Sequence, residues 1–197
     1  MSSKKNPTRD RILKATWTLL EDGGAKAVRM SDIAKAAKIS RQALYLHFPN
    51  RAELLVATTR YLDEVHDVDS LLAPSRAATA GKERLAMWVA SWGGYIPKIY
   101  GVAKALMAMD DDEEAQRAWD DRMMAVRHGC AAAVAALVED DALTPALSAE
   151  EATDLLWALL SVRNWELLCH TQGWSQGRYI AVMQKTAADM LTTPAAG

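Results

Sequence analysis

The chain has 197 residues, half of them hydrophobic, with 23 Lys and Arg against 25 Asp and Glu. Its first residues are polar and no apolar run is long enough to cross a membrane, so neither a signal peptide nor a transmembrane segment is predicted. Two cysteines, Cys130 and Cys169, are too few for a disulfide framework. These features indicate a cytoplasmic protein. The scarcity of β-branched residues beside many Ala, Leu, Met, Glu and Lys indicates an all-α class.

Charge is divided unevenly along the chain. Residues 1–60 hold twelve Lys or Arg and five Asp or Glu, a net of +7, whereas residues 61–197 carry a net of −9. Duplex DNA attracts the first part through its phosphates and repels the second. The asymmetry therefore points to nucleic acid as a partner of the N-terminal third, without indicating which sequence is bound.

In chain order, the first predicted elements are an arm and a helix. Residues 1–7 are polar and basic, and we expect them to be disordered. A helix is predicted over about 8–22, and Gly23 and Gly24 are expected to end it.

Two short helices, 31–38 and 40–48, follow and are joined by a tight turn. Ser31 and Ser40 each stand where an N-cap is expected, because a hydroxyl there accepts a hydrogen bond from an unpaired helix N–H. Pro49 stops the second helix, since it has no N–H for the next backbone hydrogen bond. The pattern predicts a helix-turn-helix.

The second of these helices has one apolar face and one polar face. The inner positions of the pair are Ile33, Ala34, Ala37, Ile39, Leu44 and Phe48. The outward positions of the second helix are Arg41, Gln42, Ala43, Tyr45 and His47. Four of these five side chains carry hydrogen-bonding groups, and a short capped helix with such a face fits the major groove of DNA.

The segment from about Thr8 to Leu55 resembles the DNA-binding domain of the tetracycline-repressor (TetR) family. The matching signature is Ile33-Ala34, Ala37, Ile39-Ser40, Leu44-Tyr45 and His47-Phe48, followed by Arg51 and Leu54. It covers about a quarter of the chain, and the remainder matches the family only in its helical layout. The resemblance implies an N-terminal three-helix DNA-binding domain followed by a C-terminal helical bundle for ligand binding and dimerisation.

Two positions depart from the family pattern. Lys38 stands where the family usually has a turn glycine, which places a non-glycine residue in a left-handed conformation. Ala43 stands where the family often has Thr or Ser, so one hydroxyl contact to a phosphate is expected to be missing.

The DNA-binding residues are assigned by type and by resemblance. Tyr45 and His47 resemble the family's residues at the DNA backbone. Arg41 and Gln42 are candidates for base edges, because Arg pairs well with guanine and Gln with adenine. Ser31, Lys38 and Arg51 are expected to hold phosphates. An ordinary solvated helix face is the alternative. The predicted set is Ser31, Lys38, Ser40, Arg41, Gln42, Ala43, Tyr45, His47 and Arg51.

The rest of the chain reads as further helices. They are predicted over 51–66 with Asn50 as cap, over 80–95, over 104–109 after a break or bend at Pro97 and Gly101, over 113–139, over 148–172 from a Ser148–Glu151 capping box, and over 175–191 with Ser175 as cap. Residues 67–80 are predicted to be a loop. We divide the chain into a DNA-binding domain, 1–50, and a helical domain, 51–197.

Aromatic and Met residues are concentrated in the second part, which holds six of the seven Trp residues beyond position 80. By resemblance, this part should contain an effector cavity, and apolar and aromatic groups line such pockets. A packed core explains the same residues, and for any one of them it is the better explanation. The predicted ligand-binding set is Trp88, Trp92, Tyr95, Tyr100, Met107, Trp119, Met123 and Arg163.

Two clusters of polar residues have more than one reading. Arg163, Glu166 and His170 lie on one helical face and either anchor a ligand or form a structural pair. The acidic run 110–114 reads as a solvated loop before a helix rather than a metal site. No cofactor and no metal are predicted.

These patterns together predict a ligand-responsive transcriptional regulator, a repressor that binds a palindromic operator as a homodimer and is released by a small apolar or cationic effector. The last two helices are the expected dimer surface. One alternative is a DNA-binding dimer without a ligand. An enzyme is disfavoured, because Cys130 with His128, and Cys169 with His170, are close neighbours on helices and point apart.

Overall fold

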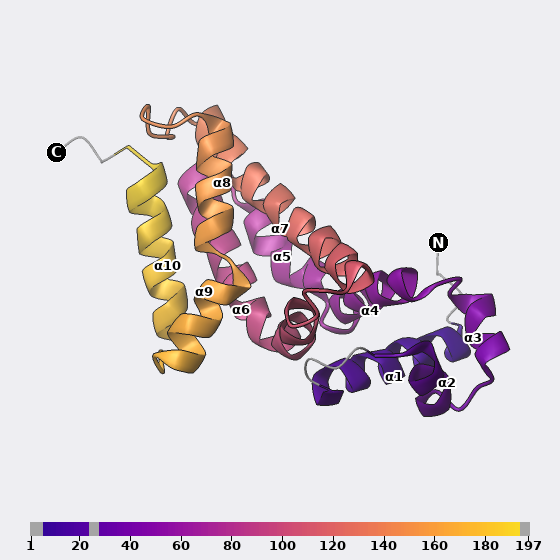
Figure 1. Cartoon of the computed structure of the whole chain (residues 1–197). Helices are drawn as coiled ribbons and strands as arrows, with labels where there is room; N and C mark the ends of the chain where they lie inside the picture. Colours follow the sequence, from indigo (N-terminus) through magenta and orange to yellow (C-terminus); the bar gives the residue numbers. More distant parts are fainter. Residues whose placement is uncertain (1–5, 24–27, 194–197) are drawn as a thin grey trace. The chain divides into compact units, whose positions relative to one another are not determined.

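The computed structural model of the chain describes residues 6–23 and 28–193. Within these ranges every regular element is a helix, apart from one isolated bridge between Leu143 and Thr192 (Figure 1). The predicted all-α class is confirmed. By packing, the chain divides into two compact units. The first unit comprises residues 1–66 and 99–123, and the second unit comprises 67–98 and 124–197. Of the arm predicted to be disordered, 1–7, residues 1–5 lie outside the described residues, as does Gly24, whereas Pro7 is the first residue of α1, where a proline needs no backbone donor.

The first unit begins with four helices. They are α1 (Pro7–Gly23), α2 (Met30–Ala36), α3 (Arg41–His47) and α4 (Arg51–Val65). Asn50 caps α4 by accepting a hydrogen bond from the Glu53 backbone N–H at 2.8 Å, as predicted. Buried residues recur at helical spacing on each element and form one core, including Ile12, Leu20, Ile33, Leu44, Phe48, Leu54 and Leu62.

The second unit contains the remaining helices. They are α5 (Val68–Ala77), α6 (Gly81–Met107), α7 (Glu113–Glu139), α8 (Ala149–Leu159), α9 (Val162–Trp165), the π-helical segment η1 (Glu166–Thr171) and α10 (Gln176–Leu191). Helices α6 and α7 run through both units, since the first unit includes 99–107 and 113–123. The predicted Ser148–Glu151 capping box is present, and α8 runs beside α10 (Figure 1).

Residues 68–77 form helix α5, whereas the sequence predicted a loop over 67–80. Two hydroxyls tie this short helix to α6: Ser91 Oγ donates to the Leu71 carbonyl at 2.9 Å, and Ser75 Oγ donates to the Arg84 carbonyl at 3.3 Å. Packing on α6 therefore stabilises a segment whose own composition favours a turn.

Helix α6 continues through Pro97 as one element, where the sequence predicted a break or a bend between two helices. Proline removes the N–H that would bond the carbonyl four residues earlier, which belongs to Gly93. Gln176 Nε2, at the start of α10, donates to that carbonyl at 2.6 Å, and Trp165 Nε1 donates to Gln176 Oε1 at 2.8 Å. The helix survives because a side chain distant in sequence replaces the missing donor.

The predicted helix over 148–172 is interrupted at Leu160 and Ser161. Trp92 Nε1 donates to the Leu160 carbonyl at 2.8 Å, and Asn164 Nδ2 donates to the Ala158 carbonyl, also at 2.8 Å. Ser161 then caps α9 by accepting from the Asn164 backbone N–H. The break is stable because its freed carbonyls have other donors.

The packing units do not coincide with a division at residue 50. Helix α4 and parts of α6 and α7 pack with α1–α3 in the first unit. The division into domains 1–50 and 51–197 refers to function and stays a prediction.

Candidate DNA-binding interface

The turn between α2 and α3 is built as the sequence predicted at two positions. Ser40 caps α3, since its Oγ accepts from the Ala43 backbone N–H at 3.0 Å. Lys38 has a φ of 53°, which is the left-handed conformation expected for the residue at the glycine position. Ser31 is not the N-cap of α2, because α2 begins at Met30 and Arg29 precedes it without a side-chain cap. Ser31 instead lies exposed in the first turn.

Helix α3 is anchored on one side and open on the other. Leu44 and the following Phe48 are fully buried. Arg41, Gln42 and Tyr45 are exposed, and Ala43 and His47 are half-buried.

Leu46 also lies on this open side, with 83% of its surface exposed. Its position two residues from the buried Leu44 places it on the opposite face of a helix. Sequence reasoning missed this residue, although helical spacing alone would have found it. A leucine here suits contact with a thymine methyl group, which apolar side chains recognise.

Two arginines of α1 hold the helix-turn-helix from inside the first unit. Arg9 Nη1 donates to the His47 carbonyl at 3.4 Å, and the Arg9 guanidinium lies over the Phe48 ring at 4.3 Å. Arg11 Nε donates to the Ala37 carbonyl at 2.9 Å. These cations satisfy the C-terminal ends of α3 and α2, where helix carbonyls lack partners.

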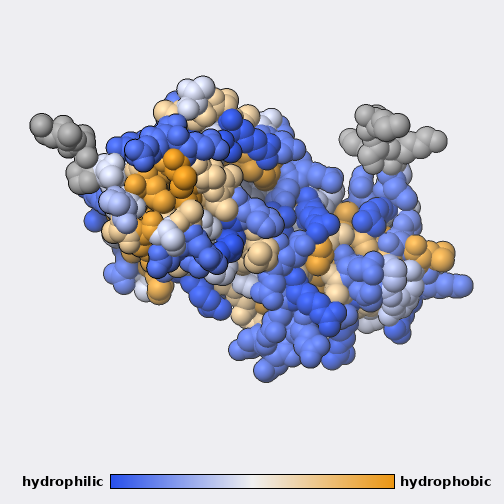
Figure 2. All heavy atoms as spheres, turned by 90° about the horizontal axis from the view of Figure 1, so that it is seen from above, coloured by the Kyte–Doolittle hydropathy of each residue, from blue (hydrophilic) through white to orange (hydrophobic). Residues whose placement is uncertain are grey.

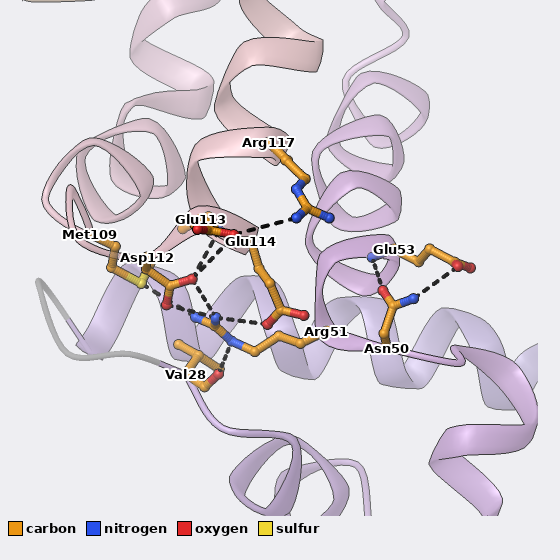
Figure 3. Close-up of polar contacts among 10 residues, drawn as sticks. Val28, Asn50, Arg51, Glu53, Met109, Asp112, Glu113, Glu114 and Arg117 are labelled. Atoms are coloured by element: carbon orange, nitrogen blue, oxygen red, sulfur yellow. Dashed lines mark hydrogen bonds and ion pairs between the residues drawn. The ribbon is translucent and has the colours of Figure 1, made fainter.

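Arg51 is bound within the first unit rather than presented to solvent (Figure 3). Its side chain is 12% exposed. Nε donates to the Val28 carbonyl at 2.6 Å, Nη1 bonds both carboxylate oxygens of Asp112 at 2.9 and 2.7 Å, and Nη2 lies 3.6 Å from Met109 Sδ. Glu114 Oε2 is 3.3 Å from Nη1. We therefore drop Arg51 from the predicted phosphate ligands.

The acidic run before α7 is the partner of Arg51. Burial by itself would raise the pKa of the Asp112 carboxyl, but hydrogen bonds from the Ala115 and Glu114 N–H groups and from Arg51 outweigh it and lower that pKa. Asp112 lies at the N-terminal end of α7 and accepts from its first N–H groups, as expected of an acidic run before a helix, but it also pairs with Arg51, so it is not simply solvated. Among the described residues, no three His, Cys, Asp or Glu side chains form a cluster that could hold a metal ion.

The predicted ligand-binding residues are distributed over both units. Trp88, Trp92, Tyr95 and Arg163 belong to the second unit, and Tyr100, Met107, Trp119 and Met123 belong to the first. Trp92 is buried, donates to the Leu160 carbonyl and has its ring 6.1 Å from that of Tyr95. These contacts give Trp92 and Tyr95 a packing role. Trp119 packs against the core of the first unit, and Arg163 is exposed.

The cysteines have the environment of unreactive thiols. Burial raises the pKa of Cys130 to about 12, although the Trp88 indole and the Arg127 charge act in the other direction. Burial also raises the pKa of Cys169. Both side chains are therefore neutral thiols near pH 7, which does not suit a nucleophile.

The N-terminal part of the chain matches a known family. Residues 12–58 match the model described as "Bacterial regulatory proteins, tetR family". The nucleoid occlusion factor SlmA of a Marinomonas species is 34% identical over 64 residues, 32% of either chain. The transcriptional regulator TtgR of Pseudomonas putida is 38% identical over 60 residues, 30% of this chain and 29% of TtgR. The chain thus aligns with about a third of the length of these relatives.

The fold of the whole chain also has known counterparts. A crystal structure of a transcriptional regulator from Saccharomonospora viridis in complex with choline is similar with a TM-score of 0.73 at 18% identity. The match covers 96% of this chain and all of that one. This likeness concerns the fold. The family match and the helix-turn-helix geometry together place residues 12–58 in the TetR family of bacterial regulatory proteins.

Proposed function

We propose that the protein is a DNA-binding transcriptional regulator whose helix α3 enters the major groove. The observation that carries the proposal is the open face of α3, where Arg41, Gln42 and Tyr45 project from a capped helix anchored by Leu44 and Phe48. Arg41 and Gln42 read base edges, Tyr45 and His47 contact the DNA backbone, and Leu46 meets a thymine methyl group. Family membership supports this role.

Phosphate contacts come from side chains that are exposed on the first unit, including that of Ser40, which also caps α3. Ser31, Lys38 and Ser40 are exposed around the turn. Arg9 and Arg11 bind backbone carbonyls and still attract DNA at long range, whereas the carboxylate of Asp112 neutralises the charge of Arg51. The proposed phosphate ligands are therefore fewer than the count of basic residues suggests.

The regulator acts as a homodimer, because two half-sites of a palindromic operator require two reading heads. The proposed interface uses α8, η1 and α10, where Leu155 and Leu167 are exposed on the single chain. Figure 2 shows apolar atoms gathered at the surface near the C-terminus. Leu156 and Leu160 are fully buried within the chain, so they do not belong to this surface.

The dimer is a repressor released by a small molecule. A ligand that binds one arrangement of the two reading heads better than the other shifts the population that fits the operator. A fold neighbour crystallised with choline supports the presence of an effector in this fold, not its identity. No helix within the described residues has the length and apolar character needed to span a membrane.

Fluorescence anisotropy with the full chain and its own upstream DNA tests the proposal. We expect affinity to fall steeply as salt rises, since each neutralised phosphate releases counterions. Arg41→Ala should cost about 1–3 kcal/mol and relax preference at one base pair, whereas Tyr45→Ala should weaken all sequences alike. Lys82→Ala, at an exposed position in the first turn of α6 and outside the proposed interface, is the control and should change nothing.

A flat salt response, or wild-type affinity and specificity in both α3 variants, would remove α3 as the reader. A DNA-binding dimer whose operator affinity no small molecule changes would support the alternative without a ligand.

A further inference from the structure

We infer that a cleft in the second unit binds a small organic carboxylate, with Arg84 as its anion-binding side chain. This inference rests on the proposed function in one respect, that the bound carboxylate would be the effector. The cleft has a volume of about 280 Å³ and is lined by residues of α5, α6 and α7. Its lining includes Leu72, Arg76, Arg84, Trp88, His128 and Gly129.

The lining has one sign of charge. It carries two guanidinium groups, a histidine and the hydroxyl of Ser75, and none of the described residues that line the cleft is Asp or Glu. Arg76 Nη1 is already paired with Asp69 Oδ1 at 2.9 Å. Within the described part of the chain, Arg84 forms no ion pair and its side chain donates to no acceptor, although it is half-buried. A half-buried unpaired guanidinium favours an anion, and its fork matches a carboxylate.

Trp88 gives the cleft its apolar wall, and Gly129 makes room for the indole. A Cβ built on Gly129 would lie 2.0 Å from Trp88 Cη2, so any larger residue would collide with the ring. Glycine in the interior of a helix costs about 1 kcal/mol relative to alanine. The chain bears this cost in the middle of α7, and the ring edge of Trp88 lies directly against the α7 backbone.

The size and the charge of the cleft define the ligand class. About 280 Å³ corresponds to roughly nine water molecules at ~30 Å³ each, which is the size of a single ring with a short acid arm. A cationic effector was expected from the aromatic residues, because cations lie well on indole faces. Arg76 and Arg84 oppose a cation here, since like charges repel in a partly desolvated site.

Three probes of equal shape and different charge test the inference on the full chain without DNA. They are phenylacetate, phenylacetamide and 2-phenylethylamine. Binding is measured by calorimetry and through the indole N–H resonance of Trp88, identified by its loss in Trp88→Phe. We expect phenylacetate to bind at least about tenfold more tightly than the other two, because only its carboxylate forms a charge-assisted hydrogen bond with Arg84. It should also shift that resonance, because the ligand would lie against the Trp88 indole.

Variants locate the binding energy. Arg84→Gln should weaken phenylacetate by about tenfold or more and leave phenylacetamide unchanged. Arg127→Gln, on α7 and paired with Asp154 outside the cleft, is the matched control and should leave phenylacetate binding unchanged. Arg84→Lys keeps the charge without the fork and should retain part of the affinity, which guards against a folding defect in the first variant.

Equal affinity for the three probes, a preference for the amine, no binding at millimolar concentration, or an unaffected Arg84→Gln variant would each overturn the inference. The readout is independent of DNA. Specific DNA binding without carboxylate binding would support the proposed regulator and contradict this site. Carboxylate binding without DNA affinity would support the site and contradict the proposed regulator.

Discussion

In the first unit, Arg9, Arg11 and Arg51 donate to backbone carbonyls around the helix-turn-helix, whereas in the second unit Trp92 and Gln176 donate to the irregular backbone. The charged donors satisfy helix ends and a loop, and Arg9 and Arg11 also add to a positive field that favours DNA, whereas Arg51 is neutralised by Asp112. The neutral donors permit a helix to pass a proline and another to break. Basic composition therefore overstates the number of phosphate contacts in the first unit. In the second unit, the Trp92 indole satisfies a backbone carbonyl.

The largest expected effect tests whether Trp92 supports the backbone of the second unit. Trp92→Ala should lower the free energy of unfolding by about 3–5 kcal/mol, because it leaves a cavity and an unpaired Leu160 carbonyl. Trp174→Ala is the matched control, since that ring is half-exposed with Arg178 over it, and should cost much less. Chemical denaturation measures both. Equal small losses would return Trp92 to the role of a cavity-lining residue.

The next prediction tests whether Arg51 stabilises the first unit through its contacts with Val28 and Asp112. Arg51→Met should lower the free energy of unfolding by about 2–3 kcal/mol, because Asp112 loses its charged partner and the Val28 carbonyl its donor. Arg60→Met on the same helix is the control. Arg60 is 62% exposed beside Asp121, so its loss should cost at most about 1 kcal/mol.

The salt dependence of DNA binding separates stability from contact. If Arg51 is structural, folded Arg51→Met protein should keep the wild-type slope of affinity against salt, whereas Lys38→Ala should reduce it by about one counterion. A reduced slope for Arg51→Met would instead restore it as a phosphate ligand.

Two glycines of the second unit differ in the space around them, so the same substitution should have opposite effects on stability. Gly129→Ala should lower the free energy of unfolding by about 1–2 kcal/mol, since overpacking against Trp88 exceeds the gain in helix propensity. Gly94→Ala should do the opposite and stabilise by up to about 1 kcal/mol, because nothing lies within 4 Å of a Cβ there. Melting temperatures test the sign of each change. A stabilised Gly129→Ala variant would show that Trp88 moves freely.

The smallest expected effect is an acid dependence in the first unit. The pKa of Asp112 is lower in the folded chain than its ordinary value of 3.8, so its contribution is full above that value and is lost as the pH falls through the folded pKa. Asp112→Asn should therefore make the loss of stability below about pH 4 less steep. Asp69→Asn, which alters an exposed pair, serves as the control in the same urea titrations.

Local signals in the sequence were enough to predict several elements. The spacing of α7, the spacing and caps of α3, α4 and α10, the Ser148–Glu151 box and the left-handed Lys38 follow from interactions within four residues, so a single segment holds all the information. The open face of α3 followed for the same reason, since Leu44 and Phe48 determine which side is buried. Even Leu46 was within reach of this reasoning.

Tertiary structure alone decided the rest, because the deciding partners are distant in sequence. The sequence around Pro97 predicts a helix break, but Gln176, 79 positions later, donates to the Gly93 carbonyl that Pro97 leaves without a partner. The sequence predicts Arg51 as a phosphate ligand, but in the fold its guanidinium pairs with Asp112. Trp88 forms the wall of a cleft because the fold places its ring against Gly129. Hydrogen bonding and packing capacity belong to single residues, but their satisfaction depends on which segments the fold brings together.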